Sequence, residues 1–211
     1  MGYKILIADD HETVRHSVQA NIKLRYSDSI IIQANSCKEV SEEIENQNFD
    51  LLILDLNMDH INPLTFISEI LEKHKKLKIL IFSMYAVETF GVRLMKMGVK
   101  GYANKEEPIT NLMRGIDNVL NGFNYWSSQI SSLLVDQLEN NQSTNLIDML
   151  SDRELEVMLL LINGNTQKEI SNTLSIHTST IATYKNRILE KLNLKSFADL
   201  VLFAARNDLI I

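Results

Sequence analysis

The sequence is poor in cysteine and contains no long apolar run. Its 211 residues hold a single cysteine, Cys37, which excludes an intramolecular disulfide framework and is typical of a reducing compartment. No apolar stretch approaches the length of a membrane span, and the apolar run near the start is too short for a signal peptide. We therefore expect a cytoplasmic protein that does not act in a membrane.

The sequence also lacks an excess of basic residues. The formal net charge is −6, and residues 148–211 carry seven Lys or Arg against eight Asp or Glu. This balance argues weakly against nucleic acid as a partner, so DNA binding would require a local basic patch. The overall composition, 45% hydrophobic and 23% charged, is that of an ordinary globular protein.

The first 122 residues alternate short apolar runs with amphipathic stretches. Runs rich in Ile and Leu predict five buried parallel strands, at 4–8, 29–34, 50–54, 78–82 and 101–104. The amphipathic stretches predict five helices, at 13–24, 37–45, 63–73, 87–97 and 108–121. Such alternation is typical of an α/β fold, a five-stranded doubly wound parallel sheet with helices on both faces.

Prolines and glycines mark the ends of these helices. The only prolines, Pro63 and Pro108, each fit the first turn of a helix. Gly98 and Gly122 fit positions just after a helix, where a left-handed backbone conformation is common.

Polar side chains stand where the predicted strands end: Asp9, Asp10, Asp55, Ser83 and Lys105. In an open α/β sheet, functional side chains gather at the carboxyl ends of the strands. Taken singly, each would be read as a turn residue or a solvated side chain. Together, three carboxylates, a hydroxyl and an ammonium describe a site for a divalent cation and a phosphoryl group. Mg²⁺ would relieve the repulsion between the carboxylates and neutralise charge while a carboxylate attacks a phosphoryl donor.

The composition changes after Gly122. Residues 127–138 can form one linker helix, and the polar segment 139–145 predicts a hinge. From residue 146 the pattern is helical throughout, and three capping patterns mark helix starts: Ser151-x-x-Glu154, Thr166-x-x-Glu169 and Ser196-x-x-Asp199. A tight turn between helices at 167–174 and 179–192 predicts a helix-turn-helix within an all-α four-helix domain. The expected domains are 1–122, the linker 123–145, and 146–211.

The second helix of a helix-turn-helix reads bases with its solvent face. An inward stripe on this helix is formed by Ile181, Tyr184, Ile188 and Leu192. For Tyr184, a cap on the core and a hydrogen bond to phosphate are equally consistent with the sequence. The stripe leaves Ala182, Thr183, Asn186 and Glu190 facing outward, which favours A·T pairs because Asn can read adenine. Residues 179–195 carry a local charge of +3, which supplies the basic patch that DNA binding requires. The expected phosphate contacts are Lys185, Arg187, Lys191, Thr166, Ser179, Thr180 and Tyr184.

Four short motifs carry a family resemblance in the first 122 residues. They are IADDH at 7–11, LDLNM at 54–58, FSM at 82–84 and GYANK at 101–105, and they resemble the receiver domain of two-component response regulators. The sequences at 150–171, 179–192 and 200–211 resemble the LuxR-type DNA-binding domain. The combination covers nearly the whole chain and is similar to the NarL/FixJ subfamily, which implies a flavodoxin-like receiver and a regulator rather than an enzyme.

The resemblance implies a role for each matching residue. Asp55 would accept a phosphoryl group from a sensor histidine kinase, and Ser83 and Lys105 would bind that group. Mg²⁺ would be held by Asp10, Asp55 and the Asn57 carbonyl, with Asp9 acting through water. Tyr102 would be a rotamer switch, unless it is a plain core aromatic. Phosphorylation would unmask the recognition helix and allow a homodimer to bind double-stranded promoter DNA.

One loop departs from the family pattern. Asp59 stands where proline is usual, and Asp59 and His60 are either neutral variation or residues that tune metal affinity and phosphoryl lifetime. Ser179 and Tyr184 replace the Lys and His common in the family, which bears on DNA affinity. A regulator that binds DNA without phosphorylation, using the receiver for dimerisation, is the alternative. A haloacid-dehalogenase phosphatase is disfavoured, because Asn57 stands where it needs a second Asp.

Overall fold

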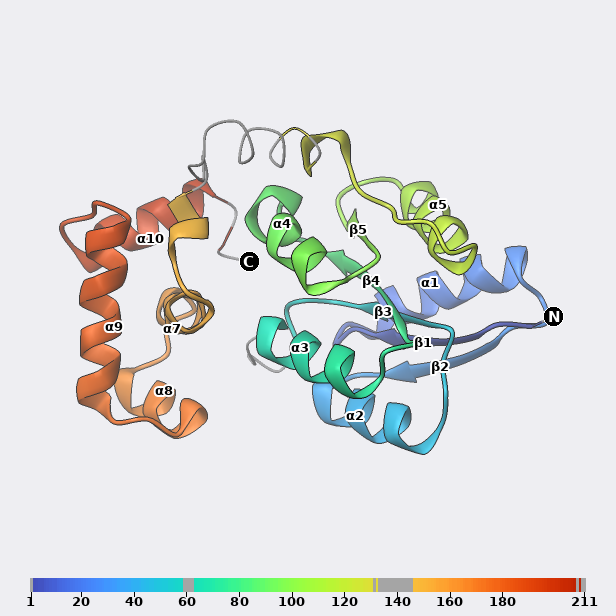
Figure 1. The fold of residues 1–211 in the computed structure, drawn as a ribbon, viewed down its shortest axis with the longest axis horizontal. Coiled ribbons are helices and arrows are strands. Elements are labelled where there is room, and N and C mark those ends of the chain that lie inside the picture. The colour runs from blue at the N-terminus through green and yellow to red at the C-terminus, as the bar shows by residue number, and fades with distance from the viewer. Residues whose placement is uncertain (1, 59–62, 131, 133–145, 208, 210–211) are drawn as a thin grey trace. The chain divides into compact units, whose positions relative to one another are not determined.

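The computed structural model describes residues 2–58, 63–130, 132, 146–207 and 209, which form two compact units, residues 1–131 and 132–211 (Figure 1). The predicted hinge at 139–145 and most of the predicted linker helix at 127–138 lie outside the described residues. The expected domain boundaries therefore stay predictions. None of the helices in the described ranges is both long and apolar enough to cross a membrane.

The first unit is built on a five-stranded parallel sheet with the order β2-β1-β3-β4-β5. The strands are β1 (Lys4–Ala8), β2 (Ile30–Ala34), β3 (Leu51–Leu54), β4 (Lys78–Ser83) and β5 (Gly101–Asn104). Each lies within one residue of its predicted bounds. This sheet confirms the predicted α/β fold class. The prediction was possible because strands that are buried on both faces of a sheet have near-continuous apolar sequences.

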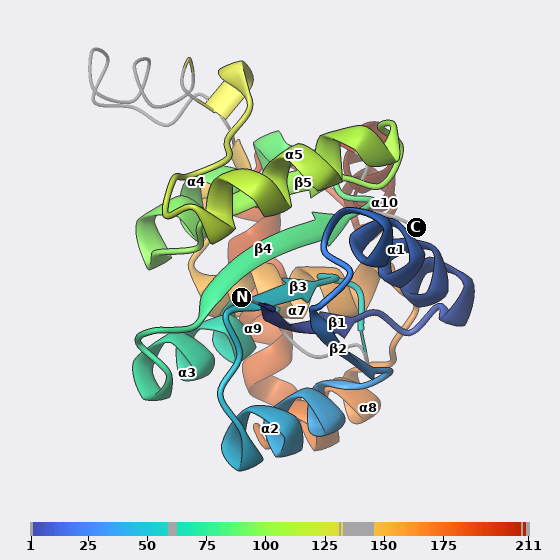
Figure 2. The ribbon, with the colours of Figure 1, turned by 90° about the vertical axis from the view of Figure 1, so that its right-hand side faces the viewer.

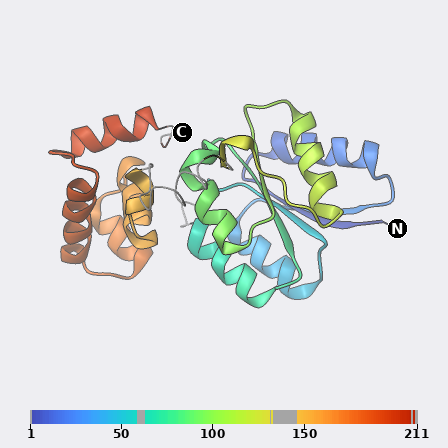
Figure 3. The same cartoon turned by 45° about the horizontal axis from the view of Figure 1, so that its top comes forward.

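Helices cover both faces of this sheet (Figures 2 and 3). On one face lie α1 (Glu12–Arg25) and α5 (Ile109–Leu120), and on the other lie α2 (Cys37–Asn46), α3 (Pro63–Lys73) and α4 (Val87–Met97) (Figure 1). Alternate strand residues point to opposite faces. Ile5, Ile53 and Leu80 therefore pack in the cluster formed with α1 and α5, which also contains Ile22 and Ile116.

The helix-end predictions hold at Pro63 and at both glycines, and need correction at Pro108. Pro63 is the first residue of α3, as predicted. Pro108 instead precedes α5 as its N-cap, with ψ of 139°, and its carbonyl accepts a hydrogen bond from the Asn111 N–H at 2.8 Å. Gly98, with φ of 105°, ends α4, where a residue with a Cβ would be strained.

The second unit contains a short 3₁₀ turn, η1 (Leu146–Met149), followed by α7 (Asp152–Ile162), α8 (Gln167–Leu174), α9 (Thr178–Lys191) and α10 (Phe197–Arg206). The central helix is α7, which contacts α8, α9 and α10. Burial on α7 extends without a break from Glu154 to Ile162. Burial on this helix is therefore not confined to one face, as expected for the central helix of the unit.

All three capping patterns begin helices, in two different ways. Ser151 with Glu154, and Thr166 with Glu169, form reciprocal capping boxes at the starts of α7 and α8. Ser196 accepts a hydrogen bond from the Asp199 N–H, but the Asp199 carboxylate receives the N–H of Lys195 rather than that of Ser196. Asp is one methylene shorter than Glu, which changes the donor that its carboxylate reaches.

The turn between α8 and α9 is stabilised by two side chains. Ser175 adopts a left-handed conformation with φ of 51° at the end of α8. The Ser171 hydroxyl donates to the Ile176 carbonyl at 2.6 Å, and Arg153 Nη2 donates to the Leu174 carbonyl at 2.9 Å. These bonds satisfy carbonyls left free at the helix end. The turn places the start of α9 at Thr178, one residue before the predicted start.

One buried carboxylate ties α7 to α9. Glu154 Oε2 lies 2.6 Å from Lys191 Nζ and accepts hydrogen bonds from the Ser151 N–H and hydroxyl at 2.8 and 3.0 Å. Burial alone would raise the pKa of Glu154, but the bonds from Lys191 and Ser151 outweigh it and hold the pKa below 4.5. The carboxylate form is therefore stabilised in the folded state.

We predict that Glu154→Gln lowers the unfolding free energy of the second unit by about 2 kcal/mol at neutral pH. Because the folded pKa is depressed, the wild type should have this contribution above pH 4.5 and lose it as the pH falls further. Hydrogen exchange of α7 amides between pH 3.5 and 7 measures both effects. Glu169→Gln, at the same place in the exposed box of α8, is the control and should cost less. Equal losses in the two variants would contradict the role of Lys191.

Candidate functional site

The five polar residues predicted at the strand ends are brought together at one edge of the sheet. The backbone ladder continues past the strands, because Asp9 N–H bonds to the Ala34 carbonyl at 3.2 Å and Asp55 N–H to the Ala8 carbonyl at 2.9 Å. The N–H of Lys105 likewise donates to the Ser83 carbonyl at 2.9 Å. The site residues are therefore positioned by the register of the sheet itself.

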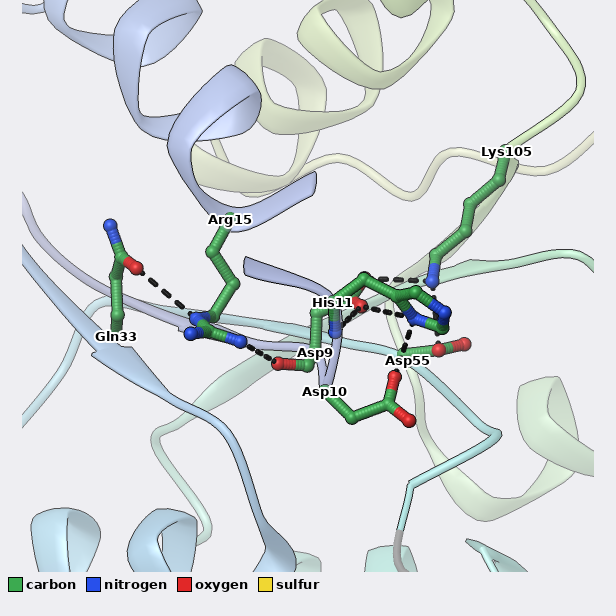
Figure 4. Close-up of polar contacts among 7 residues, drawn as sticks. All are labelled: Asp9, Asp10, His11, Arg15, Gln33, Asp55 and Lys105. Carbon is green, nitrogen blue, oxygen red and sulfur yellow. Dashed lines mark hydrogen bonds and ion pairs between the residues drawn. The ribbon is translucent and has the colours of Figure 1, made fainter. Parts of the chain in front are cut away.

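Lys105 connects two buried carboxylates (Figure 4). Its Nζ lies 2.7 Å from Asp9 Oδ2 and 2.7 Å from Asp55 Oδ2. The side chains of Lys105, Asp9 and Asp55 are 8%, 2% and 3% exposed, so water screens these contacts weakly. One ammonium thus offsets much of the repulsion between the two acids.

Burial and pairing shift the pKa values of this pair. Burial raises the pKa of Asp55 and the negative charge of Asp9 raises it further, while Lys105 opposes both. Burial alone would lower the pKa of Lys105, but Asp55 and Asp9 outweigh it and hold the pKa above its ordinary value. Lys105 is therefore a firmly protonated cation next to a poorly hydrated carboxylate.

One oxygen of Asp55 fits the metal ligand that the sequence predicts. Asp55 Oδ1 is buried, and no hydrogen-bond partner for it occurs in the part of the chain that the structure describes. Asp9, Asp10 and His11 offer ligand atoms within 4.8 Å of one another beside it. Carboxylate oxygens with room for water are the surroundings that Mg²⁺ prefers, and the side chain of Asp10 is 44% exposed. The donor set therefore fits Mg²⁺.

Two residues next to Asp9 are absent from the sequence prediction: His11 in the loop after β1, and Arg15 in the first turns of α1. His11 Nδ1 lies 2.6 Å from Asp10 Oδ1, and the His11 N–H donates to Asp9 Oδ1 at 2.9 Å. Arg15 Nη1 donates to the Asp9 carbonyl at 2.7 Å, and its Nε donates to Gln33 Oε1 at 3.1 Å (Figure 4). Arg15 thus fixes the backbone of Asp9 from the first turns of α1. The only indication of this role in the sequence is that Arg15 lies one helical turn after His11.

Tyr102 is buried and contacts the loop after β4. Its hydroxyl donates to the Tyr85 carbonyl at 2.7 Å, and Asn104 Nδ2 donates to the same carbonyl at 3.3 Å. Ser83 is fully buried, and its Oγ accepts a hydrogen bond from the Tyr85 N–H at 3.4 Å. Burial raises the pKa of Tyr85 to about 12, with a smaller contribution from Asp55. Tyr85, absent from the sequence prediction, therefore connects Ser83 with Tyr102.

The loop after β3 is described only in part. Asn57 is half-buried, and its backbone N–H makes a small contribution that lowers the pKa of Asp55. Asp59 and His60, the departure from the family pattern, lie outside the described residues. The two readings of this loop therefore stay open, and the role of the Asn57 carbonyl stays a prediction.

The predicted inward stripe of α9 is largely confirmed. Ile181, Ile188 and Leu192 are buried, but Tyr184 is only half-buried and lies at the border of the core. The residues expected to face DNA fall into two groups. Thr166, Ser179, Thr183, Asn186 and Arg187 are exposed, whereas Thr180, Ala182 and Lys185 are half-buried.

Several of the residues predicted to bind DNA already have partners within the second unit, and Thr183 is among them because its hydroxyl donates to the Ser179 carbonyl at 3.0 Å. Lys191 Nζ is paired with Glu154 and also donates to the Met149 carbonyl at 3.1 Å. Lys185 Nζ lies 4.9 Å from the centroid of the Phe197 ring, a cation–π contact that leaves donors free. The Thr166 hydroxyl donates to Glu169 Oε2 at 2.8 Å. Lys191 is thus the least available of the predicted phosphate contacts.

Comparison with known families and proteins agrees with this geometry. Residues 5–117 match the response regulator receiver domain, and residues 148–204 match the luxR family of bacterial regulatory proteins. The chain is 33% identical to the oxygen regulatory protein NreC of Staphylococcus carnosus, with 98% of this chain and 99% of that protein covered. It is 28% identical to the response regulator GacA of Pseudomonas aeruginosa, with 98% and 97% covered.

Solved structures show the same fold at lower identity. RcsB of Salmonella enterica serovar Typhimurium, bound to a promoter in the presence of phosphomimetic BeF3⁻, is similar with a TM-score of 0.79 and 20% identity. That comparison covers 98% of this chain and all of the other. From these matches, and from the site at the carboxyl edge of its sheet, the chain belongs to the NarL/FixJ family of response regulators, with a receiver domain followed by a LuxR-type DNA-binding domain.

Proposed function

We propose that Asp55 accepts a phosphoryl group from a sensor histidine kinase and that this step controls promoter binding by α9. The observation that carries the proposal is the state of the Asp55 carboxylate. One of its oxygens is 2.7 Å from the Lys105 ammonium, while the other is buried without a hydrogen-bond partner in the described part of the chain. A buried carboxylate with a free oxygen, at the carboxyl edge of the sheet, suits nucleophilic attack.

The site supplies a partner for each charge that the transfer creates. An oxygen of Asp55 forms the new O–P bond, while the N–P bond to the kinase histidine breaks and its electron pair returns to the imidazole. Asp10, Asp55 and the Asn57 carbonyl would hold Mg²⁺, with Asp9 acting through water, and the bound ion would supply positive charge to offset that of the phosphoryl oxygens. Lys105 moves from the carboxylates to one phosphoryl oxygen, and the Ser83 hydroxyl donates to another.

The phosphoryl group would act on the loop after β4 through Ser83 and Tyr102. It adds roughly −1.5 to −2 charge and three acceptor oxygens. Moving Ser83 towards it breaks the 3.4 Å contact with the Tyr85 N–H, and Tyr102 then exchanges its bond to the Tyr85 carbonyl for the vacated space. The α4 and β5 surface changes with it, which favours a homodimer able to bind paired half-sites. In this proposal the regulator acts in the cytoplasm on double-stranded promoter DNA.

We predict that Asp55→Asn abolishes the response to a phosphodonor. With acetyl phosphate and Mg²⁺, the wild type should form an acyl phosphate and bind its promoter about tenfold more tightly, and the variant should do neither. Phosphate-affinity electrophoresis and fluorescence anisotropy measure the two effects. Asp28→Asn, an exposed acid in a turn, is the control. A full response in Asp55→Asn would overturn the role of Asp55, and an unresponsive wild type that still binds DNA would favour the phosphorylation-independent alternative.

We predict that Asp10→Asn raises the dissociation constant for Mg²⁺ about tenfold, because it removes one anionic ligand. Calorimetric titration of the full chain with Mg²⁺ measures this change. Glu12→Gln removes the same charge from the first turn of α1, where its partner is His16, and should leave the affinity nearly unchanged. An effect of the same size in both variants would show that Asp10 acts only through its negative charge at a distance and is not a ligand of the metal.

We predict different salt dependences for two lysines of α9. Lys185→Gln should lower the slope of log K against log salt by about 0.9, the value for one lost phosphate contact. Lys191→Gln should leave the slope unchanged and instead destabilise the second unit, because its ammonium is paired with Glu154. Anisotropy at several salt concentrations, with a melting curve of each variant, separates the effects. A lower slope in Lys191→Gln would mean that Lys191 leaves Glu154 on binding DNA.

A further inference from the structure

A cavity lies at the opposite end of the receiver sheet from Asp55. It is a groove of about 570 Å³, lined by residues 44 and 47–50 from the α2–β3 connection and by residues 73–78 from the α3–β4 connection. We call it the lower groove. Because α2 and α3 run antiparallel to the strands that follow them, their carboxyl ends meet here, at the amino ends of β3 and β4 (Figure 1). Nothing in the proposed phosphorylation step uses these residues.

The lower groove is strongly basic in an acidic chain. Four lysines, Lys73, Lys75, Lys76 and Lys78, line it together with His74, although the net charge of the protein is −6. Among these lining residues the only acid is Asp50, whose Oδ2 accepts the Lys4 N–H at 2.8 Å. Lys78 donates to the Leu120 carbonyl at 2.9 Å. For Lys73, Lys75 and Lys76, which are exposed, the structure records no ion pair with a described residue.

The floor of the lower groove is apolar. Ile44, Phe49 and Leu77 form it and remain 7%, 8% and 8% exposed. The exposed amide side chain of Asn48 adds hydrogen-bonding capacity at the rim. An apolar floor with convergent polar groups at its rim, in a volume between about 300 and 1,000 Å³, is typical of small-molecule sites.

Helix ends account for only part of this basic cluster. Lysines near a helix carboxyl end often do no more than complement its dipole, and Lys73 lies in the last turn of α3. The carboxyl ends of α2 and α3 each amount to about half a negative charge, so together they offset roughly one of the four ammonium groups. The remaining positive charge is unmatched within the groove.

We propose that the lower groove binds a small anion that carries two or more adjacent phosphate groups. Lysine ammonium groups are point charges that bind phosphate oxygens from several directions, and three of them border the same cavity. The apolar floor suits the base of a nucleotide. Inorganic polyphosphate and a nucleoside triphosphate share this chemistry, and the experiment distinguishes them. The site is distinct from Asp55 and requires neither phosphorylation nor Mg²⁺.

The test is a titration of the full-length, ¹⁵N-labelled chain with ATP, tripolyphosphate and adenosine, in EDTA so that Asp55 and its metal site play no part. The amides of Asn48, Phe49 and Leu77 should shift with ATP or tripolyphosphate. Lys75→Gln/Lys76→Gln should weaken this binding about tenfold. The matched control is Lys38→Gln/Lys100→Gln, which removes the same charge from exposed positions outside the groove. The control should bind as the wild type does.

The outcomes separate the ligand classes. Tighter binding of ATP than of tripolyphosphate assigns the groove to nucleotides, and equal binding assigns it to the phosphate chain alone; both support the proposal. No shift at these amides at about 1 mM of either anion, or an equal loss in both double variants, overturns it. A short duplex that shifts the same amides more strongly than either anion also overturns it, in favour of a nucleic acid surface.

Discussion

The receiver depends on one ammonium group held between two buried carboxylates. Without Lys105, burying Asp9 and Asp55 together would leave two unscreened negative charges in a site of low dielectric constant. The order β1-β3-β4-β5 and the extension of its hydrogen bonds beyond the strand ends bring these three residues into contact. The sheet can therefore position reactive groups at its edge because a cation directly after its last strand makes their burial tolerable.

The sequence predicts the positions of the residues at the strand ends well, but it does not predict the side chains that contact them. Strands buried on both faces leave a plain signal, and polar residues that follow them must lie at one edge once the strands are parallel. Arg15 on the Asp9 carbonyl and Tyr85 beside Tyr102 leave no such signal, because each contact joins segments that only the fold brings together. Pro108 shows a different limit: the position before a helix and the first position within it both suit the fixed φ of proline.

In the DNA-binding domain, too, the sequence predicts the helices but not the contacts between residues that are distant in the chain. Capping boxes and the apolar stripe identify its helices because these signals are local in sequence. The charge count could not show that Lys191 pairs with Glu154, which is 37 residues away in the chain. Tyr184 was ambiguous in the sequence and remains at the border of the core, because its position on α9 is neither fully inward nor fully outward. A lysine in a basic patch can thus be structural.

The pair formed by Lys191 and Glu154 separates two responses to ionic strength. Contacts between exposed cations and phosphates are screened over about 8 to 10 Å at physiological salt, whereas a 2.6 Å contact to a carboxylate that is 4% exposed is screened far less. If α9 contacts DNA as proposed, a rise in salt would detach it from the phosphates while the contact between Lys191 and Glu154 keeps it anchored to α7. The reading surface would dissociate intact, ready to bind again without refolding.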